Sequence, residues 1–286
     1  MPDANNLKPL PMNGVSDYHC HCDYSVDAVG TIDEYCKAAL KRNLAEICFT
    51  THYDSNPNAE IGNQSELVVR VNGELKPATP EALAQYVDDV RAAHDEYYPM
   101  GLSVRLGVEF GWFSGCEESA ARLKEEYDFD YMLCGVHELD NICYCCSHQF
   151  EKCFSRYSAE QMAEKYYGEV FAAVRSGLFD TIAHLDYYRK FGGTVYGNVI
   201  NEVHKPYLDE LFGLLKKHNT TIEINTAALR KGLKEYYPAT SIINAAKKAG
   251  VEIYRIGSDA HAPDQVGFDF EAASALAPPF LAGCDD

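Results

Sequence analysis

Histidines and carboxylates recur in this chain directly after short apolar segments of the kind that form β-strands. His19 and His21 have the spacing that sends two side chains to one face of an extended segment, and Asp259 and His261 repeat it. Mixed nitrogen and oxygen ligands of this kind suit zinc, iron or manganese. The set comprises His19, His21, His52, Glu109, His137, His184, Asp259 and His261.

Each of these residues, taken singly, has a structural explanation, since a histidine beside a strand is often a hydrogen-bonded wall residue. Taken together, six imidazoles and two carboxylates are hard to explain as structural residues, because protonated imidazoles would repel one another and buried carboxylates need partners. Bound divalent metal ions would solve both problems. Eight ligands also exceed what one tetrahedral ion requires. The pattern therefore predicts two or three divalent ions close together, a type of centre that generates hydroxide and clamps phosphoryl oxygens.

The elements that must position these residues alternate between short apolar runs and longer segments of helical period. Thr31 and Glu34 have the spacing of a capping box at the start of the first helix. The predicted strands are 15–19, 45–50, 103–109, 129–136, 179–183, 221–225 and 252–258. The predicted helices are 31–42, 80–97, 117–126, 159–175, 205–217 and 241–248.

This alternation predicts an α/β fold, a closed TIM-like barrel of seven parallel strands in a single domain over residues 1–286. In such a barrel the carboxyl ends of the strands meet at one rim, where barrel enzymes keep their sites. The polar segments 55–79 and 140–157 are expected to be irregular excursions over the mouth of the barrel.

Several motifs, in order and spacing, resemble those of the polymerase and histidinol phosphatase (PHP) superfamily over nearly the whole chain. They are His19-Cys20-His21, Thr51-His52, Gly107-Val-Glu109, Gly135-Val-His137, Ala183-His184-Leu-Asp186 and Gly257-Ser-Asp259-Ala-His261. Within the superfamily the chain looks most like the histidinol-phosphate phosphatases. The segments that carry this likeness include His184-Leu-Asp-Tyr-Tyr-Arg189 and Glu223-Ile-Asn-Thr-Ala-Ala-Leu-Arg230.

The resemblance implies a distorted seven-stranded barrel with a trinuclear metal centre. By this likeness the first ion takes His19, His21, Glu109 and Asp259, and Glu109 bridges to a second ion held by His137 and His184. A third ion takes His52, His261 and the residue six positions after His21. That residue is Asp27, where many family members carry histidine; aspartate is also a competent ligand.

The implied reaction is hydrolysis of a small phosphate monoester, most simply histidinol phosphate, by a hydroxide that bridges the metal ions. Glu109, Asp259 and His261 are the residues expected to serve catalysis, with His261 or a metal-held water protonating the leaving alkoxide. The resemblance also places Arg189 and Arg230 at the phosphate, where forked contacts are possible.

An acidic group near the rim would suit the amine and imidazole of histidinol phosphate, and Glu138 is available. The family pattern has an aromatic residue at this position, which leaves room for another substrate. Two alternatives to histidinol phosphatase therefore stay open. The chain could act on another small phosphate ester or a nucleotide, or it could be a noncatalytic metal-binding protein.

The acidic composition excludes a nucleic-acid-binding protein that works by bulk charge, because 43 acidic against 25 basic residues give a net charge of −18. The chain lacks a long apolar run and an N-terminal signal sequence, so a cytoplasmic protein with no membrane partner is expected. The sequence does not specify an oligomeric state.

The 11 cysteines are expected to be reduced, because their number is odd, the chain is long and no export signal is present. Four of them crowd one segment, where they could bind a soft metal but lack the paired C-x2-C spacing of a zinc knuckle. Free thiols in a loop are the preferred interpretation. These four are Cys143, Cys145, Cys146 and Cys153.

Overall fold

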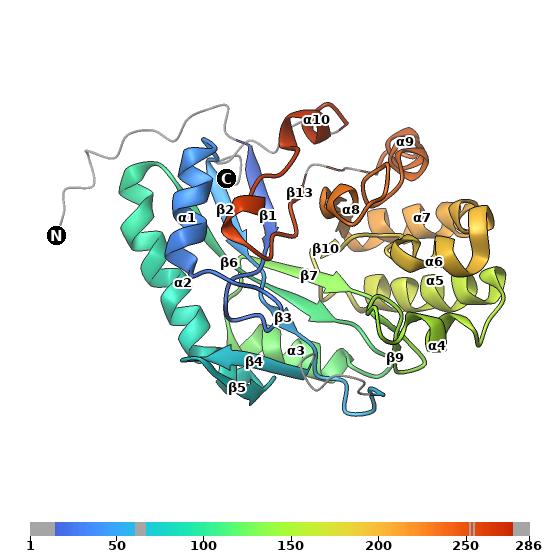
Figure 1. Ribbon diagram of the computed structural model, residues 1–286, viewed down its shortest axis with the longest axis horizontal. Helices are drawn as coiled ribbons and strands as arrows, with labels where there is room; N and C mark the ends of the chain where they lie inside the picture. Colours follow the sequence, from blue (N-terminus) through green and yellow to red (C-terminus); the bar gives the residue numbers. More distant parts are fainter. Residues whose placement is uncertain (1–14, 61–66, 252, 254, 277–286) are drawn as a thin grey trace.

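A parallel β-barrel surrounded by helices forms the centre of the computed structural model, which describes residues 15–60, 67–251, 253 and 255–276 (Figure 1). The hydrogen-bonded order is β11-β10-β7-β6-β2-β1-β13-β12, and β3 also pairs with β6. The bounds are β1 Ser16–Cys20, β2 Glu46–Phe49, β3 His52–Tyr53, β6 Ser103–Gly111, β7 Tyr131–Gly135, β10 Thr181–Ile182, β11 Thr221–Ile222, β12 Ile224–Asn225 and β13 Ile256–Gly257.

The barrel closes through the segment 221–225, because β11 pairs with β10 while β12 pairs with β13. Only Glu223 separates β11 from β12, so the two are halves of one predicted strand. Every pairing around this ring is parallel. Among the described residues the ring has seven segments, which confirms the predicted TIM-like α/β barrel. Glu252 and Tyr254, in the last predicted strand, lie outside the described residues.

Helices cover the outside of the barrel at the places where the sequence predicts them (Figure 1). The predicted capping box is present, since Glu34 N–H donates to Thr31 Oγ1 at 3.3 Å and Thr31 N–H donates to Glu34 Oε2 at 2.8 Å. The predicted helices are α1 Ile32–Lys41, α2 Ala84–Tyr97 after a 3-10 turn at Pro80–Leu83, α3 Glu117–Glu126, α5 Ala159–Ser176, α7 Leu208–His218 and α9 Thr240–Lys248. Short additional helices are α4 Phe150–Phe154, α6 Arg189–Tyr196, α8 Ala227–Arg230 and α10 Phe270–Ser274.

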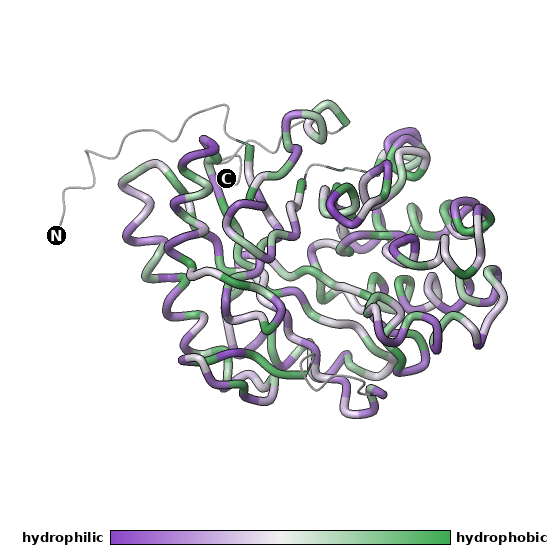
Figure 2. The backbone as a smooth tube through the Cα atoms, in the orientation of Figure 1, coloured by the Kyte–Doolittle hydropathy of each residue, from purple (hydrophilic) through white to green (hydrophobic). Residues whose placement is uncertain are grey.

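The helices are amphipathic, so that their apolar faces pack on the strands while their polar faces meet solvent. Figure 2 shows hydrophobic and hydrophilic stretches alternating along the outer helices. Helix α5, for example, buries Met162, Tyr166, Val170 and Val174 at helical spacing. No described helix is long and apolar enough to cross a membrane.

The prediction of an irregular excursion over 55–79 is wrong for its second half. Strands β4 (Val68–Val71) and β5 (Glu74–Pro77) form an antiparallel hairpin. The turn residues Asn72 and Gly73 both have positive φ, at 54° and 80°, as a tight two-residue hairpin turn requires. This dipeptide connects the end of β4 to the start of β5. Residues 61–66 of the same segment lie outside the described residues.

The second predicted excursion, 140–157, also contains regular structure. Strands β8 (Glu138–Leu139) and β9 (Ile142–Cys143) pair in an antiparallel hairpin, and α4 follows. The hairpin turns at Asp140 and Asn141, which both have positive φ. Because β8 starts one residue after His137, this hairpin extends directly from the rim of the barrel.

Candidate metal centre

The ends of β1 and β6 bring three buried ligands together. His19 Nε2 lies 3.0 Å from His21 Nε2 and 3.3 Å from Glu109 Oε2, and each of the three residues is at most 1% exposed. Asp259 joins them from the loop after β13, with Oδ1 3.5 Å from His21 Nε2. These distances bring together the four residues that the sequence assigns to the first ion.

Glu109 also belongs to a second group. Its other carboxylate oxygen, Oε1, lies 2.8 Å from His184 Nε2 and 3.3 Å from His137 Nε2. Oε1 therefore faces His137 and His184, whereas Oε2 faces His19, His21 and also His52, whose Nδ1 lies 3.0 Å away. Two oxygens that face different sets of imidazoles are the arrangement of a carboxylate that could bridge two metal ions. The ligand atoms of His19, His21 and Glu109 all lie within 4.8 Å of one another, and so do those of Glu109, His137 and His184.

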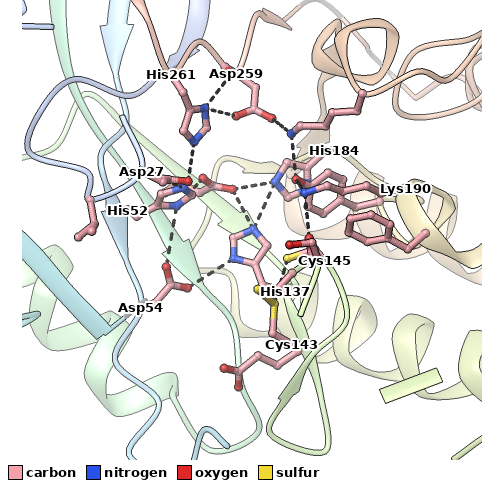
Figure 3. A pocket seen from close by; sticks show the side chains of 18 of the residues that line it. Asp27, His52, Asp54, His137, Cys143, Cys145, His184, Lys190, Asp259 and His261 are labelled. Carbon is pink, nitrogen blue, oxygen red and sulfur yellow. Dashed lines mark hydrogen bonds and ion pairs between the residues drawn. A yellow bond between two sulfur atoms is a disulfide. The ribbon is translucent and has the colours of Figure 1, made fainter. Parts of the chain in front are cut away.

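A third, more exposed group forms around His52 and His261, and His21 completes it within the same 4.8 Å limit. Asp27 reaches this group with Oδ2 3.1 Å from His261 Nε2 and Oδ1 3.9 Å from His52 Nε2 (Figure 3). The Asp27 side chain is 61% exposed, against 22% for His52 and 23% for His261. The predicted third ligand set is thus assembled at the solvent side of the centre.

The Asp27 loop is held in place by an arginine from the β4–β5 hairpin. Arg70 donates from Nη1 to the Asp23 carbonyl oxygen and from Nη2 to the Val26 carbonyl oxygen, both at 2.7 Å. Arg70 was not assigned a role from the sequence. The segment that was expected to be an irregular excursion therefore positions one of the predicted ligands.

Two glycines make room for the buried ligands. A Cβ atom on Gly135 would lie 2.5 Å from His137 Nε2 and 2.7 Å from Glu109 Oε1. A Cβ atom on Gly257 would lie 2.5 Å from His19 Cβ. Any larger residue at either position would force the ligands apart, because real Cβ contacts are not this short.

Two carboxylates that were not predicted from the sequence orient the imidazoles. Glu223, between β11 and β12, accepts from His19 Nδ1 at 3.0 Å and from the backbone N–H of His184 at 2.8 Å. Asp54 Oδ1 lies 3.4 Å from His137 Nδ1. Metal-ligating histidines usually donate their second ring N–H to such a carboxylate. Glu223 begins the segment Glu223-Ile-Asn-Thr-Ala-Ala-Leu-Arg230, and the resemblance of this segment to the family was the sequence signal that could have identified it.

The donor chemistry fits metal ions. Because His19 Nδ1 faces a carboxylate and carries the ring proton in the neutral form, its Nε2 presents a lone pair toward His21 Nε2 and Glu109. Lone pairs that converge at these distances repel one another unless a cation lies between them. A divalent ion supplies that charge with the ligand types that zinc, iron and manganese accept.

The pKa values show the same concentration of opposing charges. Burial lowers the pKa of His52, but Glu109 and Asp27 raise it, with a net rise to about 9. Burial lowers the pKa of His21, and its neighbours His52 and His261 lower it further, well below the usual range. A cluster that shifts the pKa values of neighbouring imidazoles in opposite directions is typical of a functional site.

A pocket of about 650 Å³ opens above these ligands. Among the described residues, the lysine and arginine side chains that line it are Lys190, Arg230 and Lys231. Lys231 Nζ donates to Asp259 Oδ2 at 3.0 Å and to the Tyr187 hydroxyl at 2.9 Å, and Lys190 Nζ lies near the same ring (Figure 3). The pocket therefore combines convergent metal ligands with cations, which suits an anionic substrate. Neither lysine was predicted from the sequence, although each lies next to one of the two predicted arginines.

Arg230 lines the pocket as expected. Its Nη2 donates to the carbonyl oxygens of Ser258 and Asp259, each at 2.8 Å. Its Nη1 is buried and has no hydrogen-bond partner among the described residues. A buried donor without a partner is costly, so this atom is available to an anionic ligand.

Arg189 is placed differently. It is 6% exposed, does not line the pocket, and pairs through Nε with Asp186 Oδ2 at 2.7 Å. It also donates to the Tyr236 carbonyl oxygen, and its guanidinium stacks over Tyr237. The structure therefore does not bring Arg189 to the phosphate position that the sequence predicted, because the buried Asp186 holds it within the protein.

Glu138 lies in the wall of the pocket, half-buried, and accepts a hydrogen bond from Asn56 Nδ2 at 2.6 Å. Burial raises its pKa, and the Asn56 hydrogen bond opposes that shift. Glu138 thus lines the pocket of the metal ligands; its contact with a substrate stays a prediction.

The expectation of reduced thiols in the cysteine-rich segment is wrong at two positions. Cys143 and Cys146 form a disulfide, because the chain turns after β9 and brings their Cα atoms to 5.8 Å, within the range that a disulfide needs. Cys153, in α4, is buried and outside any disulfide. Also buried and outside any disulfide are Cys20, Cys22, Cys36, Cys48, Cys116 and Cys134. Cys284 lies outside the described residues.

Comparison with known proteins agrees with this geometry. Residues 17–227 match the model of the PHP domain. The chain is 32% identical over 267 residues to the "Probable histidinol-phosphatase" of Deinococcus radiodurans, with 92% of each chain covered. It is 23% identical to the "Histidinol-phosphatase" of Bacillus subtilis, with coverage of 90% and 97%.

Two solved structures have the same fold. One is histidinol phosphate phosphatase from Lactococcus lactis, complexed with zinc, L-histidinol and phosphate, with a TM-score of 0.72, 19% identity and 92% of each chain covered. The other is the putative histidinol phosphatase from Listeria monocytogenes, with a TM-score of 0.73, 18% identity and coverage of 90% and 99%. The chain therefore belongs to the PHP-domain family and, within it, to the histidinol-phosphatase group.

Proposed function

We propose that this protein is a metal-dependent phosphatase that hydrolyses histidinol phosphate to histidinol and phosphate, and that the whole chain is a single domain of this type. The observation that carries the proposal is the carboxylate of Glu109, whose two oxygens face different sets of imidazoles at the base of a pocket lined by Lys190, Arg230 and Lys231. The names of the curated relatives support the substrate.

The metal ligands in this proposal are those that the sequence predicts. His19, His21, Glu109 and Asp259 hold one ion, and Glu109 with His137 and His184 holds a second. Asp27, His52 and His261 hold a third, with zinc, manganese or iron as the candidates. Bound ions lower the pKa of water and neutralise charge on phosphoryl oxygens. The zinc in the complex of the Lactococcus lactis phosphatase supports this class of ion.

The chain's own residues bind and orient the ester. Arg230 Nη1 has an unused donor, so it can contact a nonbridging phosphate oxygen, and Lys190 adds a second positive charge to the same pocket. Lys231 stays on Asp259 and holds that carboxylate in place. Glu138 faces the pocket, where its carboxylate suits the amine of histidinol.

Glu109, Asp259 and His261 remain the proposed catalytic residues. The carboxylates of Glu109 and Asp259 would act by holding the metal ions at the base of the pocket. His261 is partly exposed and has Nδ1 3.0 Å from the Asp259 carbonyl oxygen, which fixes its ring beside the pocket. Its Nε2 can pass a proton to the leaving alkoxide oxygen only when that nitrogen is protonated and not bound to the third ion.

The test is phosphate release from a panel of monoesters by the purified protein, with metal content measured on the same sample. We expect histidinol phosphate to be hydrolysed with the highest kcat/KM. In the Glu138→Gln variant, kcat/KM for histidinol phosphate should fall more than kcat/KM for a phosphate ester of an uncharged alcohol. A fully metallated protein that releases no phosphate from any ester contradicts the proposal.

A further inference from the structure

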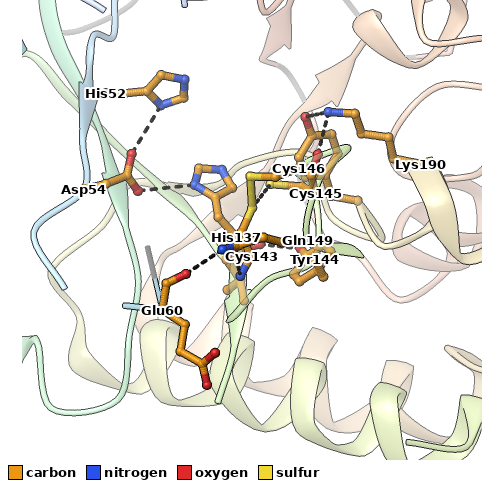
Figure 4. Close-up of a disulfide and its surroundings, with 12 residues drawn as sticks. His52, Asp54, Glu60, His137, Cys143, Tyr144, Cys145, Cys146, Gln149 and Lys190 are labelled. Atoms are coloured by element: carbon orange, nitrogen blue, oxygen red, sulfur yellow. Dashed lines mark hydrogen bonds and ion pairs between the residues drawn. A yellow bond between two sulfur atoms is a disulfide. The ribbon is translucent and has the colours of Figure 1, made fainter. Parts of the chain in front are cut away.

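The wall of the metal pocket contains three cysteines in a stretch of four residues. Cys143 and Cys146 are joined as a disulfide, and Cys145 Sγ lies 3.4 Å from Cys143 Sγ (Figure 4). All three line the pocket that contains the predicted metal ligands. The third sulfur therefore lies next to a disulfide that faces the same cavity as the proposed active site.

We propose that Cys143, Cys145 and Cys146 form a thiol–disulfide exchange site in the pocket wall. The thiolate of Cys145 attacks Cys143 Sγ, so that a bond forms between Cys143 and Cys145 while the bond to Cys146 breaks. Cys146 leaves as a thiolate and takes up the proton that Cys145 gave up. The step consumes no oxidant or reductant, since one disulfide and one thiol are present before and after it.

The position of the disulfide favours exchange over a structural role. Its cysteines are three residues apart, so the bond closes a very short loop and removes little entropy from the unfolded chain. The half-exposed Cys145 also contrasts with the described thiols outside this segment, which are buried, for example Cys48 and Cys134. Access to solvent is what a thiol needs to exchange with small reagents.

The site is connected to the pocket cations and to the metal ligands. Lys190 Nζ donates to the Cys145 carbonyl oxygen at 2.8 Å, and the backbone N–H of Tyr144 donates to the His137 carbonyl oxygen at 3.1 Å (Figure 4). Cys143 pairs with Glu138 in the β8–β9 hairpin. A change of partner moves Cys145 toward Cys143, so it also shifts the carbonyl group that holds Lys190.

A small dithiol would reduce the disulfide fully. In that reaction the dithiol is oxidised to its own disulfide, two electrons pass to Cys143 and Cys146, and both cysteines end as thiols. The inference about Lys190 rests on the proposed function, because it assumes that this lysine faces the substrate. The exchange itself does not depend on phosphatase activity.

Exchange is tested first on metal-free protein that carries the disulfide. The protein is treated with an alkylating reagent for increasing times, and the labelled cysteines are identified by peptide mass spectrometry. We expect label on Cys145 and on Cys146, because both are thiols in turn. Label that stays confined to Cys145 overturns the proposal.

Variants make the same test independent of labelling rates. After treatment with glutathione disulfide, Cys146→Ser is expected to gain a bond between Cys143 and Cys145, and Cys143→Ser is expected to form no disulfide within the segment. Cys116→Ser, at a buried thiol of the core, is the matched control and should behave like the parent protein. A Cys146→Ser protein whose Cys143 and Cys145 both remain thiols contradicts the proposal, provided that the control forms its disulfide.

The link to the pocket is tested with the metallated enzyme. Reduction with a dithiol is expected to raise KM for the phosphate ester about fivefold, as for one lost hydrogen bond, with little change in kcat. The Lys190→Met variant should have a raised KM that no longer responds to the dithiol. A parent enzyme whose KM is unchanged by reduction removes the link to the pocket, whereas an enzyme inactive in both states contradicts the proposed function instead.

Discussion

The buried and exposed sides of the candidate metal centre use the same ligand types but are held in different ways. On the buried side, His19 and Glu109 extend from strands and His19 is fixed by Glu223. On the exposed side, Asp27 lies on a loop that Arg70 holds through carbonyl oxygens. A ligand on a strand end with a buried partner is preorganised, whereas a loop ligand can move. We therefore expect the buried side to bind its ions more tightly.

The largest effect is expected from Glu109→Gln, which removes the charge that both buried groups share. The amide cannot bridge two ions, so the loss of several kcal/mol of charge stabilisation should reduce kcat about 1,000-fold. Metal analysis should show that both buried ions are lost or weakened. The exposed Glu81→Gln serves as the control, and a Glu109→Gln protein with parental turnover would contradict the shared role.

A second variant, Arg189→Ala, tests whether this buried arginine contributes to stability rather than to substrate binding. Removing one partner of the buried pair with Asp186 should lower the free energy of unfolding by about 3–5 kcal/mol. This loss should appear in urea unfolding, while metal content and KM stay close to parental values in the folded fraction. Lys190→Ala is the comparison, because it should change KM and leave stability nearly unchanged. The reverse result would place Arg189 at the substrate after all.

Glu223→Gln tests whether the buried side depends on its supporting carboxylate. The amide keeps the shape but weakens the hydrogen bond to His19 Nδ1, so metal affinity should fall roughly 10–100-fold. Competition with a chelator measures this affinity, and kcat at saturating metal should recover much of the parental value. Equal metal affinity in the variant and the parent would show that Glu223 supports the fold rather than the ligands.

The smallest effect is expected from Asp27→Asn on the exposed side. We expect a loss of about tenfold in the affinity of one ion, since the carboxylate is largely exposed and its charge is screened by water. Metal titration should then show one weak site beside unchanged tight sites. Asp27→His supplies the ligand that many family members carry, and it should restore the third site. Loss of all ions in Asp27→Asn would remove the distinction between the two sides.

The sequence predicted much of the fold and of the ligand set. Alternation of apolar runs with helical periods is a local property, so the barrel and its main helices could be recognised from it. The histidines followed the strand ends, and parallel strands in a barrel bring such ends to one rim. The resemblance to a known family then grouped the same residues into the three sets that the distances bring together.

The sequence did not predict which of two neighbouring basic residues faces the pocket. Arg189 and Lys190 are adjacent, and only packing against the buried Asp186 turns Arg189 away. Likewise, the disulfide between Cys143 and Cys146 depends on the turn after β9, which brings the two Cα atoms together. The Asn72-Gly73 turn signal was detectable in the sequence, but the segment 55–79 that contains it was expected to be irregular.

By itself, the sequence determined the residue types that can bind metal and the elements that carry them, because these depend on periodicity and spacing along the chain. Tertiary structure alone decided that Glu223 holds His19, that Arg70 holds the Asp27 loop and that the cysteines line the same pocket. Each of these contacts joins segments distant in sequence, and their distances depend on how the barrel closes and how its loops pack.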